Sequence, residues 1–392
     1  RPAARRTSAD RNRIPGQSIP CQMARRLLSP PAICLEDIFC SNVPGSMTQP
    51  KVALLMPGRR KLAIGILALV CGGCGSPLQG AAHPSSRSTA TSGPTAAAST
   101  PCSITSRPSP RFGAAMAYDA SRGNIVLFSG VRGDGSPPLA DTWTFDGCRW
   151  TSLTPATSPP GRSFGAMTYD SQHGLIVLFG GGSANSDPGR NDTWTWDGRT
   201  WSQHRVTSPP VMAHASLEYD RASAVVVLIG QALAADATVV WTWDGDAWQQ
   251  RHPANPPPGR SGAAVAYGAR GGILFFGGQP GEAGALNDSW VWDGAGWTEL
   301  HPASSPAGGY ARMARDDART DVVLVEADGT WTWNGSNWTA TAGPGSPPFE
   351  YFRSIAYEAA THQVLLFGGK SSQTNLATDE IWTWDGTNWS SR

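Results

Sequence analysis

IVLFGGGSANSDPGRNDTWTWDGRTWSQ, residues 176–203, is the stretch that decides the fold. It contains an apolar run, a glycine cluster, a polar loop, Trp-x-Trp, Asp-Gly and a closing tryptophan, and this pattern returns six times. The closing tryptophans lie 41 to 51 residues apart, at Trp150, Trp201, Trp248, Trp297, Trp338 and Trp389. A period near 50 residues predicts a repeat array in which every unit forms one supersecondary structure.

Each unit contains four short segments with the composition of strands. In the second unit they are residues 163–169, 175–179, 193–196 and 201–204. The apolar runs are β-branched and aromatic and too short for helices, which favours strands. Asp197-Gly198 predicts a two-residue hairpin turn between the last two strands. The sequence therefore predicts an all-β protein of four-stranded antiparallel units.

The order of these motifs resembles the kelch repeat. IVLFGG, the polar loop, NDTWTWDG and the closing Trp carry the resemblance, which covers residues 111–389. It implies a six-bladed β-propeller around a central channel, with a seventh blade open if residues before Arg111 pair elsewhere. The Trp-Asp dipeptides lack the Gly-His of a WD40 repeat. The fold is similar to that of the central domain of galactose oxidase, but no positions match that family's copper site, and we expect no cofactor.

The tryptophans form a pattern of their own. All 17 occupy three recurring positions of the unit, and Phe145 occupies the eighteenth. Side chains two residues apart on a strand share a face, so Trp194 and Trp196 are expected to pack between neighbouring blades. Burying one large aromatic side chain contributes about 1.5–3 kcal/mol, so the set supplies much of the core. An aromatic platform for sugars is the alternative.

The chain before the repeats has a different composition. Residues 1–55 have no periodic apolar pattern and are expected to be a disordered extension outside the working protein, with translation starting at Met56 or Met47. Residues 56–74 have a basic start, an apolar segment and Gly-Gly-Cys, which resembles the signal peptide and lipobox of bacterial lipoproteins, with Cys74 as the lipidated residue. Residues 75–107 are expected to be a disordered linker and residues 108–392 the propeller.

This order of segments predicts an exported protein of the cell envelope. We expect a lipid anchor to hold it on the outer face of the membrane, with plain secretion or an uncleaved anchor as alternatives. Cys102 and Cys148 are the only cysteines after Cys74, and in an exported protein they are candidate disulfide partners. Two free thiols are the alternative.

Charge and motif spacing exclude several kinds of ligand. The whole chain has a formal net charge of +1, but residues 62–392 alone sum to about −7 because the first 61 residues are rich in arginine and lysine. No basic stripe suited to phosphates remains, so no nucleic acid partner is expected. The propeller contains no HxH, HExxH or Cys-x-x-Cys spacing, so no metal site is predicted.

Candidate ligand-binding residues stand where each unit enters its first strand. This entry lies on the face that also carries the long, dissimilar loops 131–140, 182–190, 279–286 and 370–378, and function is expected on such loops. The recurring positions near the channel mouth would hold a small polar or anionic ligand through Arg111, Arg162, Arg260, His214, Tyr310 and Glu350. The alternative is that the arginines bond loop carbonyls.

The sequence thus predicts a monomeric binding or scaffold module rather than an enzyme. Its partner would be a protein or a glycan, recognised through the irregular loop face. A carbohydrate-active enzyme that uses the channel mouth and a structural spacer are the two alternatives.

Overall fold

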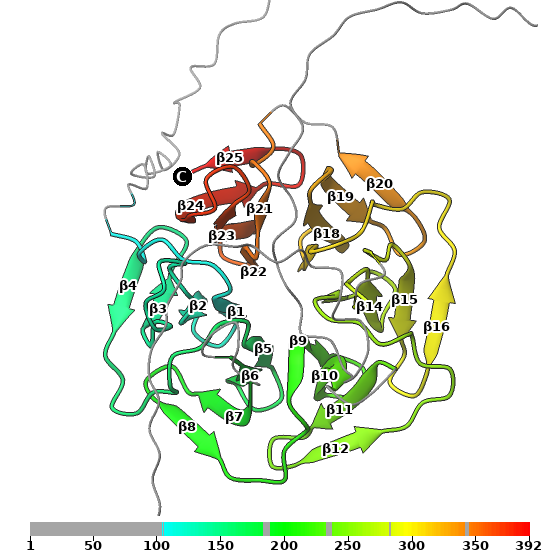
Figure 1. Cartoon of the computed structure of the whole chain (residues 1–392), viewed down its shortest axis with the longest axis horizontal. Coiled ribbons are helices and arrows are strands. Elements are labelled where there is room, and N and C mark those ends of the chain that lie inside the picture. The colour runs from blue at the N-terminus through cyan, green and yellow to red at the C-terminus, as the bar shows by residue number, and fades with distance from the viewer. Residues whose placement is uncertain (1–103, 105, 183–188, 233–236, 282–283, 342–344) are drawn as a thin grey trace, which may run out of the picture. The chain divides into compact units, whose positions relative to one another are not determined.

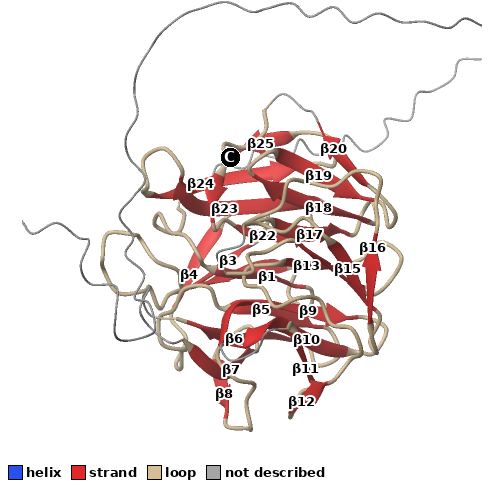
Figure 2. Cartoon of the chain, turned by 45° about the vertical axis from the view of Figure 1, so that its right-hand side comes forward, coloured by secondary structure: helices blue, strands red, loops and turns tan. Residues whose placement is uncertain are grey.

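A computed structural model of the chain describes residues 104, 106–182, 189–232, 237–281, 284–341 and 345–392. The expected extension, the signal peptide with Cys74, most of the linker and Cys102 lie outside these residues. Within the described ranges the protein is all β, as predicted, and no helix there is long and apolar enough to cross a membrane (Figure 2).

The strands form six antiparallel sheets, and the chain completes one sheet before it starts the next. The first three blades are β1 (Ala115–Asp119), β2 (Asn124–Phe128), β3 (Thr142–Phe145) and β4 (Trp150–Leu153); β5 (Ala166–Asp170), β6 (Leu175–Gly181), β7 (Arg190–Trp196) and β8 (Trp201–His204); and β9 (Met212–Asp220), β10 (Val225–Ala232), β11 (Val239–Trp243) and β12 (Trp248–Arg251). The fourth and fifth are β13 (Ala264–Tyr267), β14 (Ile273–Phe276), β15 (Ser289–Trp292) and β16 (Trp297–Leu300); and β17 (Arg312–Asp316), β18 (Asp321–Glu326), β19 (Gly329–Trp333) and β20 (Trp338–Thr341). The sixth contains β21 (Glu350–Tyr351), β22 (Ser354–Glu358), β23 (Gln363–Ser371), β24 (Ala377–Trp384) and β25 (Trp389–Ser391).

The six sheets are the blades of a propeller. The first long strand of each blade is innermost, and these strands contact one another in the order β1, β5, β9, β13, β17, β22 and back to β1 (Figure 1). The ring is therefore closed, and the prediction of a six-bladed propeller with four-stranded antiparallel blades is confirmed. Blade 6 differs from the others because the short β21 pairs with the far end of β23.

Within the described part of the chain, the ring closes without a strand exchanged between its ends. Blade 6 instead holds the entry to blade 1 through the backbone: Arg111 N donates to the Thr378 carbonyl (2.9 Å), and Gly369 N donates to the Arg111 carbonyl (3.0 Å). Ile104 packs against the apolar cluster that blades 1 and 6 share. Hydrogen bonds and apolar packing together hold this seam.

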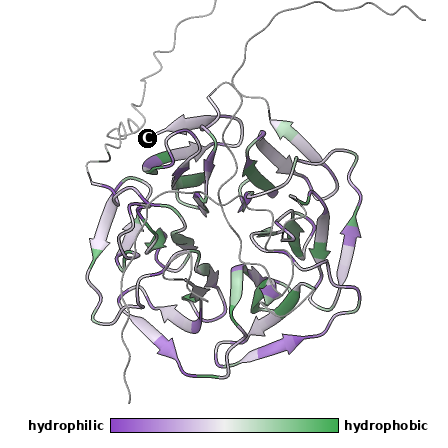
Figure 3. Ribbon diagram, in the orientation of Figure 1, coloured by the Kyte–Doolittle hydropathy of each residue, from purple (hydrophilic) through white to green (hydrophobic). Residues whose placement is uncertain are grey.

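The core lies between blades. Trp194, Trp196 and Trp201 of blade 2 form one cluster with Val126 and Phe128 of blade 1, and five further clusters join the other neighbouring pairs. The prediction that Trp194 and Trp196 pack between blades is confirmed. Apolar residues gather on the inner strands and polar ones on the outer strands (Figure 3), so alternate faces of each inner strand are buried against the two adjacent blades.

The closing tryptophan of a unit also bonds to the preceding blade. Its indole N–H donates to a hydroxyl on the third strand of that blade in four cases: Trp201 to Thr142, Trp248 to Thr193, Trp338 to Ser289 and Trp389 to Thr330, at 2.8 to 3.0 Å. The equivalent positions of the other two blades carry Val240 and Ile381. There the indole N–H groups of Trp297 and Trp150 are buried without a partner among the residues that the structure describes.

Two local predictions were wrong. The turn between β7 and β8 has four residues rather than two, because Trp196 pairs directly with Trp201. Of its first two residues only Gly198 has a positive φ (89°), while the Asp197 carboxylate accepts the N–H groups of Arg199 and Thr200. The first strand of the second unit begins at Ala166 rather than at residue 163, since Phe164 has a φ of 57°, which interrupts the extended backbone.

Candidate functional site

Three of the six predicted ligand-binding residues, Arg111, Arg162 and Arg260, each pair with an aspartate of their own blade. We call each such arginine–aspartate pair, with the tryptophan that bonds to the same carboxylate, a clamp. In blade 2, Arg162 makes two parallel hydrogen bonds to Asp192 (2.7 and 2.9 Å), and the Trp194 indole donates to the same carboxylate (2.7 Å). Arg162 Nε donates to the Pro160 carbonyl and Nη1 to that of Gly180. Burial by itself raises the pKa of the Asp192 carboxyl, but the hydrogen bonds and charge of Arg162 outweigh it, and the net pKa is lowered.

The same clamp recurs in blades 1 and 4. Its members there are Arg111 with Asp141 and Trp143, and Arg260 with Asp288 and Trp290. The three arginines are about 1% exposed. Each ties the entry of a blade to the start of its third strand and to loop carbonyls, so the structure places these arginines inside the blades and not in the channel mouth.

Blade 6 makes a similar connection with its arginine at a different position. Glu350 stands where the clamp arginine would be, and Arg353 bridges Glu350 (3.1 Å) and Glu380 (3.2 Å). The Trp382 indole donates to Glu380 (2.9 Å), and the Thr378 hydroxyl donates to Glu350 (2.7 Å). Burial raises the pKa of the Glu350 carboxyl. Glu350 is thus engaged within its blade as well.

Of the remaining two predicted residues, His214 lines the cavity at the channel mouth, and Tyr310 lies next to it, against the Phe352 ring. They belong to a ring of equivalent positions, one per blade, occupied by Gly113, Phe164, His214, Gly262, Tyr310 and Phe352. Five of these six have a positive φ, between 47° and 68°. A bulky residue in this left-handed region is strained, and such strain is concentrated at functional sites. Position 113 favours glycine for a second reason, because a Cβ there would lie 2.9 Å from the Phe164 ring.

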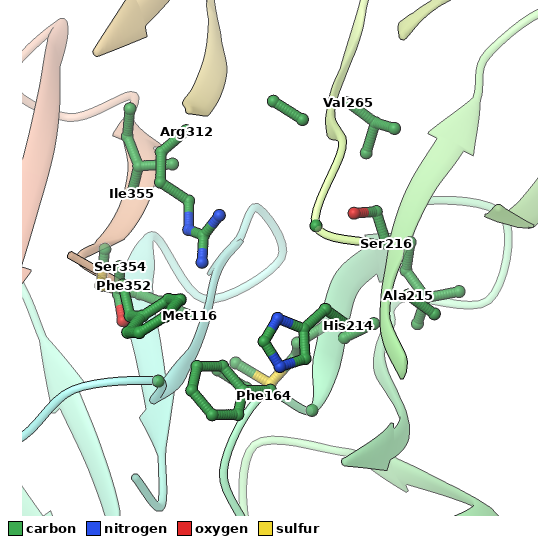
Figure 4. Close-up of a pocket in the computed structure, with 18 of the residues that line it drawn as sticks. Met116, Phe164, His214, Ala215, Ser216, Val265, Arg312, Phe352, Ser354 and Ile355 are labelled. Carbon is green, nitrogen blue, oxygen red and sulfur yellow. The ribbon is translucent and has the colours of Figure 1, made fainter. Parts of the chain in front are cut away.

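The ring positions gather aromatic side chains on the loop face. Phe164 stacks on the His214 imidazole with centroids 4.2 Å apart and planes 18° apart. Phe352 lies 4.9 Å from Phe164 and 5.0 Å from Tyr310, in edge-to-face contacts. All four side chains keep part of their surface exposed, unlike most of the tryptophans. Phe164, His214 and Phe352 line a cavity of about 160 Å³ (Figure 4).

One cation projects into this cavity. Figure 4 shows the Arg312 guanidinium pointing from blade 5 toward His214 and Phe164. Its Nε donates to the Arg353 carbonyl (3.1 Å) and its Nη1 to the Ala311 carbonyl (3.0 Å). Among the described residues no carboxylate forms an ion pair with Arg312, and its Nη2 has no hydrogen-bond partner. Burial lowers the pKa of Arg312 to about 10, so the group stays charged at neutral pH.

The imidazole opposite Arg312 is neutral. Burial, followed by the positive charge of Arg312, lowers the pKa of His214 to about 4. A neutral imidazole has one ring nitrogen that donates and one that accepts a hydrogen bond. The mouth therefore offers a positive charge, an uncharged polar ring and aromatic faces around one small cavity.

Arg312 was not among the predicted site residues, but it differs from the residues at the equivalent position of the other units. Two residues after the ring of mouth positions, the other five units have small side chains: Ala115, Ala166, Ser216, Ala264 and Ser354. A long cation at a position that is otherwise Ala or Ser has to extend into the space that the small residues leave open. The same comparison singles out Glu218, whose equivalents are Ala117, Thr168, Ala266, Ala314 and Ala356.

Glu218 lines a second cavity, of about 670 Å³, at the other end of the innermost strands. Six apolar residues, one from each blade, line both cavities: Met116, Met167, Leu217, Val265, Met313 and Ile355. Burial raises the pKa of the Glu218 carboxyl to about 7, against the opposing charges of Arg221 and Arg315. Those two arginines share Asp317 and flank the Tyr267 ring.

Two other sequence predictions concern cysteine and metal. Cys148 lies in the turn between β3 and β4 and is disulfide-bonded. Cys102 lies outside the described residues, so the pairing of Cys102 with Cys148 stays a prediction. Within the ranges that the structure describes, no three His, Cys, Asp or Glu side chains gather as a metal site would require.

Comparison with known proteins supports the architecture alone. No protein-family model matches the chain, and no curated protein matches it. Among solved structures, the chain is similar to the one titled "Structure of YjhT", with a TM-score of 0.55 and 13% sequence identity over 74% of this chain and 99% of that chain. At this level of identity the likeness shows a shared fold, and the function has to be argued from the channel mouth itself.

Proposed function

We propose that the protein is a binding module that holds an anionic, ring-sized group at the channel mouth on its irregular loop face. The observation that carries the proposal is Arg312, a cation without an ion-pair partner among the described residues, pointing into a cavity lined by aromatic rings. A buried charge is costly unless it is paired, so such a group is best satisfied by a ligand of opposite charge.

The size and lining of the mouth support a small group. A cavity of about 150 Å³ accommodates benzene, and the mouth encloses about 160 Å³. Phe164 and Phe352 offer ring faces and edges for one flat or apolar side of the ligand, and Tyr310 packs against Phe352. His214, neutral above its lowered pKa, adds a hydrogen bond without competing for the charge.

Matched pairs of small molecules test this proposal. Galacturonate and galactose, which differ by one carboxylate, are titrated against the full chain by calorimetry. We expect the anion to bind and the neutral sugar to bind at least about tenfold more weakly, since a hydrogen-bonded charge contributes about 1.5–3 kcal/mol.

Substitution at Arg312 is the second arm of the test. Arg312→Met, which keeps an unbranched side chain and removes the charge, should abolish the preference for the anion, and Arg312→Lys should keep part of it. Arg199→Gln, an exposed arginine in the turn between β7 and β8, is the charge-matched control. Equal binding of both sugars by the unaltered protein, or an unchanged preference in Arg312→Met, would refute the proposal.

One observation favours a second candidate, an enzyme that acts on a carbohydrate. Glu218 has a pKa raised to about 7 by burial, and a carboxyl group poised near the working pH suits general acid–base catalysis. Met116 and Leu217 line both cavities, whereas Glu218 lines only the second one. An enzyme that uses Glu218 would therefore hold its substrate in the second cavity and not at the mouth. A time course of bound sugars by NMR, with Glu218→Gln as the comparison, separates turnover from binding.

The cellular location belongs to the same proposal. The signal-type segment and Cys74 support an exported protein with a lipid anchor, which would present the loop face to ligands outside the cell. Mass spectrometry of the purified native protein tests this. A diacylated Cys74 at the N-terminus is expected, and peptides from residues 1–55 would contradict it.

A further inference from the structure

We propose that the mouth is the end subsite of a longer binding surface for an acidic oligosaccharide, with a second subsite at Tyr351 and Lys370. This inference rests on the proposed function, since it takes the group at Arg312 as the terminal unit of the ligand. It adds a chain length, a repeating charge and two residues that the single-site proposal does not use.

The second subsite is built by the strand that distinguishes blade 6. β21 pairs with the far end of β23, and in that pairing Tyr351 lies directly opposite Lys370. Side chains of directly opposed residues in an antiparallel pair have their Cβ atoms about 4.5–5.5 Å apart. The short strand therefore places an aromatic residue opposite a lysine at the rim of the loop face. The equivalent pairs of four other blades contain no lysine: they are Phe112 with Val131, Ser163 with Gly182, Ala213 with Gln231, and Ser261 with Gln279.

Aromatic rings connect this rim to the mouth without a break. From Tyr351, which is 36% exposed, centroid distances are 6.1 Å to Tyr310 and 6.0 Å to Phe352. Phe352 in turn lies 4.9 Å from Phe164, which stacks on His214. Each of these side chains is partly exposed, whereas an aromatic side chain kept only for packing would be covered like Trp196 or Trp201.

Two cations mark the two ends of this row. Arg312 lies in the mouth, and the Lys370 ammonium lies 5.7 Å from the centre of the Phe112 ring, whose own centre is 6.1 Å from Phe352. Lys370 is the only lysine after residue 61. It forms no ion pair among the described residues, although the propeller as a whole is acidic. Two isolated positive charges joined by aromatic rings complement a ligand that carries an anion on successive units.

A chain of uronate sugars has this chemistry. The C–H groups on one side of a pyranose ring are slightly positive and pack against the negative face of an aromatic ring. Each uronate unit adds one carboxylate, which Arg312 and then Lys370 would receive. Sugar hydroxyls would find the phenol groups of Tyr310 and Tyr351. The mouth holds one ring, so the second unit has to lie outside it, over β21.

The length dependence of binding tests the inference. Galacturonate and its linear dimer and trimer are titrated against the full chain and against Lys370→Gln, Tyr351→Ala and Arg199→Gln. We expect the dimer to bind about five- to tenfold more tightly than the monomer, as one partly exposed charge pair and one aromatic contact allow. Both blade 6 variants should lose this gain while they bind the monomer unchanged.

Selective labelling gives a readout that does not depend on affinity. Because residues 62–392 contain one lysine, acylation of Lys370 by an amine-reactive ester is followed on a single peptide by mass spectrometry. The dimer should slow this reaction several-fold, and the monomer should leave it unchanged.

The outcomes separate this inference from the proposed function. If the monomer binds through Arg312 but the dimer binds no better, or if the dimer leaves Lys370 labelling unchanged, the second subsite is refuted and the proposed function stands. If neither binds, both are refuted. A glutamate dipeptide or tripeptide with the same length gain as the sugars would overturn the assignment to a glycan.

Discussion

Substitution of Val240 by threonine should stabilise the protein. Val240 and Trp297 share one buried cluster between blades 3 and 4, and the Trp297 indole N–H is buried with no partner in the described part of the chain. In four other blades a Thr or Ser hydroxyl at this position accepts that hydrogen bond. Thr has nearly the shape of Val, so Val240→Thr adds an acceptor and creates no cavity.

The magnitude follows from the hydrogen bond gained. A hydrogen bond within a protein contributes about 0.5–1.5 kcal/mol, and here the donor is already desolvated, so its burial cost does not have to be met again. We expect the free energy of unfolding to rise by about 1 kcal/mol and the melting temperature by roughly 2–3 °C for a domain of this size. Urea denaturation should show a higher midpoint with an unchanged m-value.

Two further variants make the result specific. Val226→Thr alters a fully buried valine in the cluster on the opposite face of the blade, where the new hydroxyl cannot reach Trp297, and it should destabilise the protein by about 1–3 kcal/mol. Thr193→Val removes the hydrogen-bond acceptor of the Trp248 indole and should also lower the free energy of unfolding by about 1–3 kcal/mol. If Val240→Thr destabilises the protein as much as Val226→Thr does, the account of the inter-blade indole bonds is wrong.

Other variants test the clamp and the mouth. Arg162→Met leaves the Asp192 carboxylate without its charged partner and should reduce the free energy of unfolding by about 3–5 kcal/mol in urea denaturation. Arg199→Gln should have no measurable effect. The folded-state pKa of Asp192 lies below its ordinary value of 3.8. The clamp therefore contributes stability above pH 3.8 and loses it as the pH falls through the lowered pKa. The free energy of unfolding should fall less steeply with acidification in Arg162→Met than in the unaltered protein. At Phe164, where φ is 57°, glycine should be more stable than alanine by about 1 kcal/mol, the reverse of an ordinary strand position, as thermal melts of the two variants will show. NMR titration should find the His214 imidazole neutral down to a pH of about 4, and Arg312→Met should raise its pKa.

The repeat pattern was sufficient to predict the four-stranded unit, and its resemblance to the kelch repeat implied the six-bladed propeller. Tryptophans at fixed positions, glycines after an apolar run and a period near 50 residues each constrain the same four-stranded unit, and six copies reinforce one another. The prediction that Trp194 and Trp196 pack between blades followed from strand periodicity alone. Turn geometry was less accessible, because Asp-Gly occurs both in two-residue turns and in the four-residue turn that the Asp197 carboxylate stabilises here.

The candidate site was harder to predict because a charged side chain at the entry of a blade can either face the channel or pair with an opposite charge inside the blade. Arg162 was expected at the channel mouth, but its pairing with Asp192 depends on two residues 30 positions apart whose contact the sequence does not state. Arg312 was overlooked although it departs from the small residues of the other units, since departure from a repeat signals function only when the structure shows an open space beside it. Comparison of the repeats with one another, column by column, is the signal that would have found it.

The uninterrupted order of strands within each blade has a consequence for how the molecule can be rebuilt. Among the strands of residues 115–391, no sheet borrows a strand from the opposite end of the chain, so no blade has to be first. A gene opened at any connection between blades, with the codon for Arg392 joined through a short spacer to that for Arg107, would encode the same six sheets in rotated order. Such circular permutants would exchange the seam between blades 6 and 1 for a new one elsewhere, and their relative melting temperatures would rank how firmly each pair of neighbours holds the ring together.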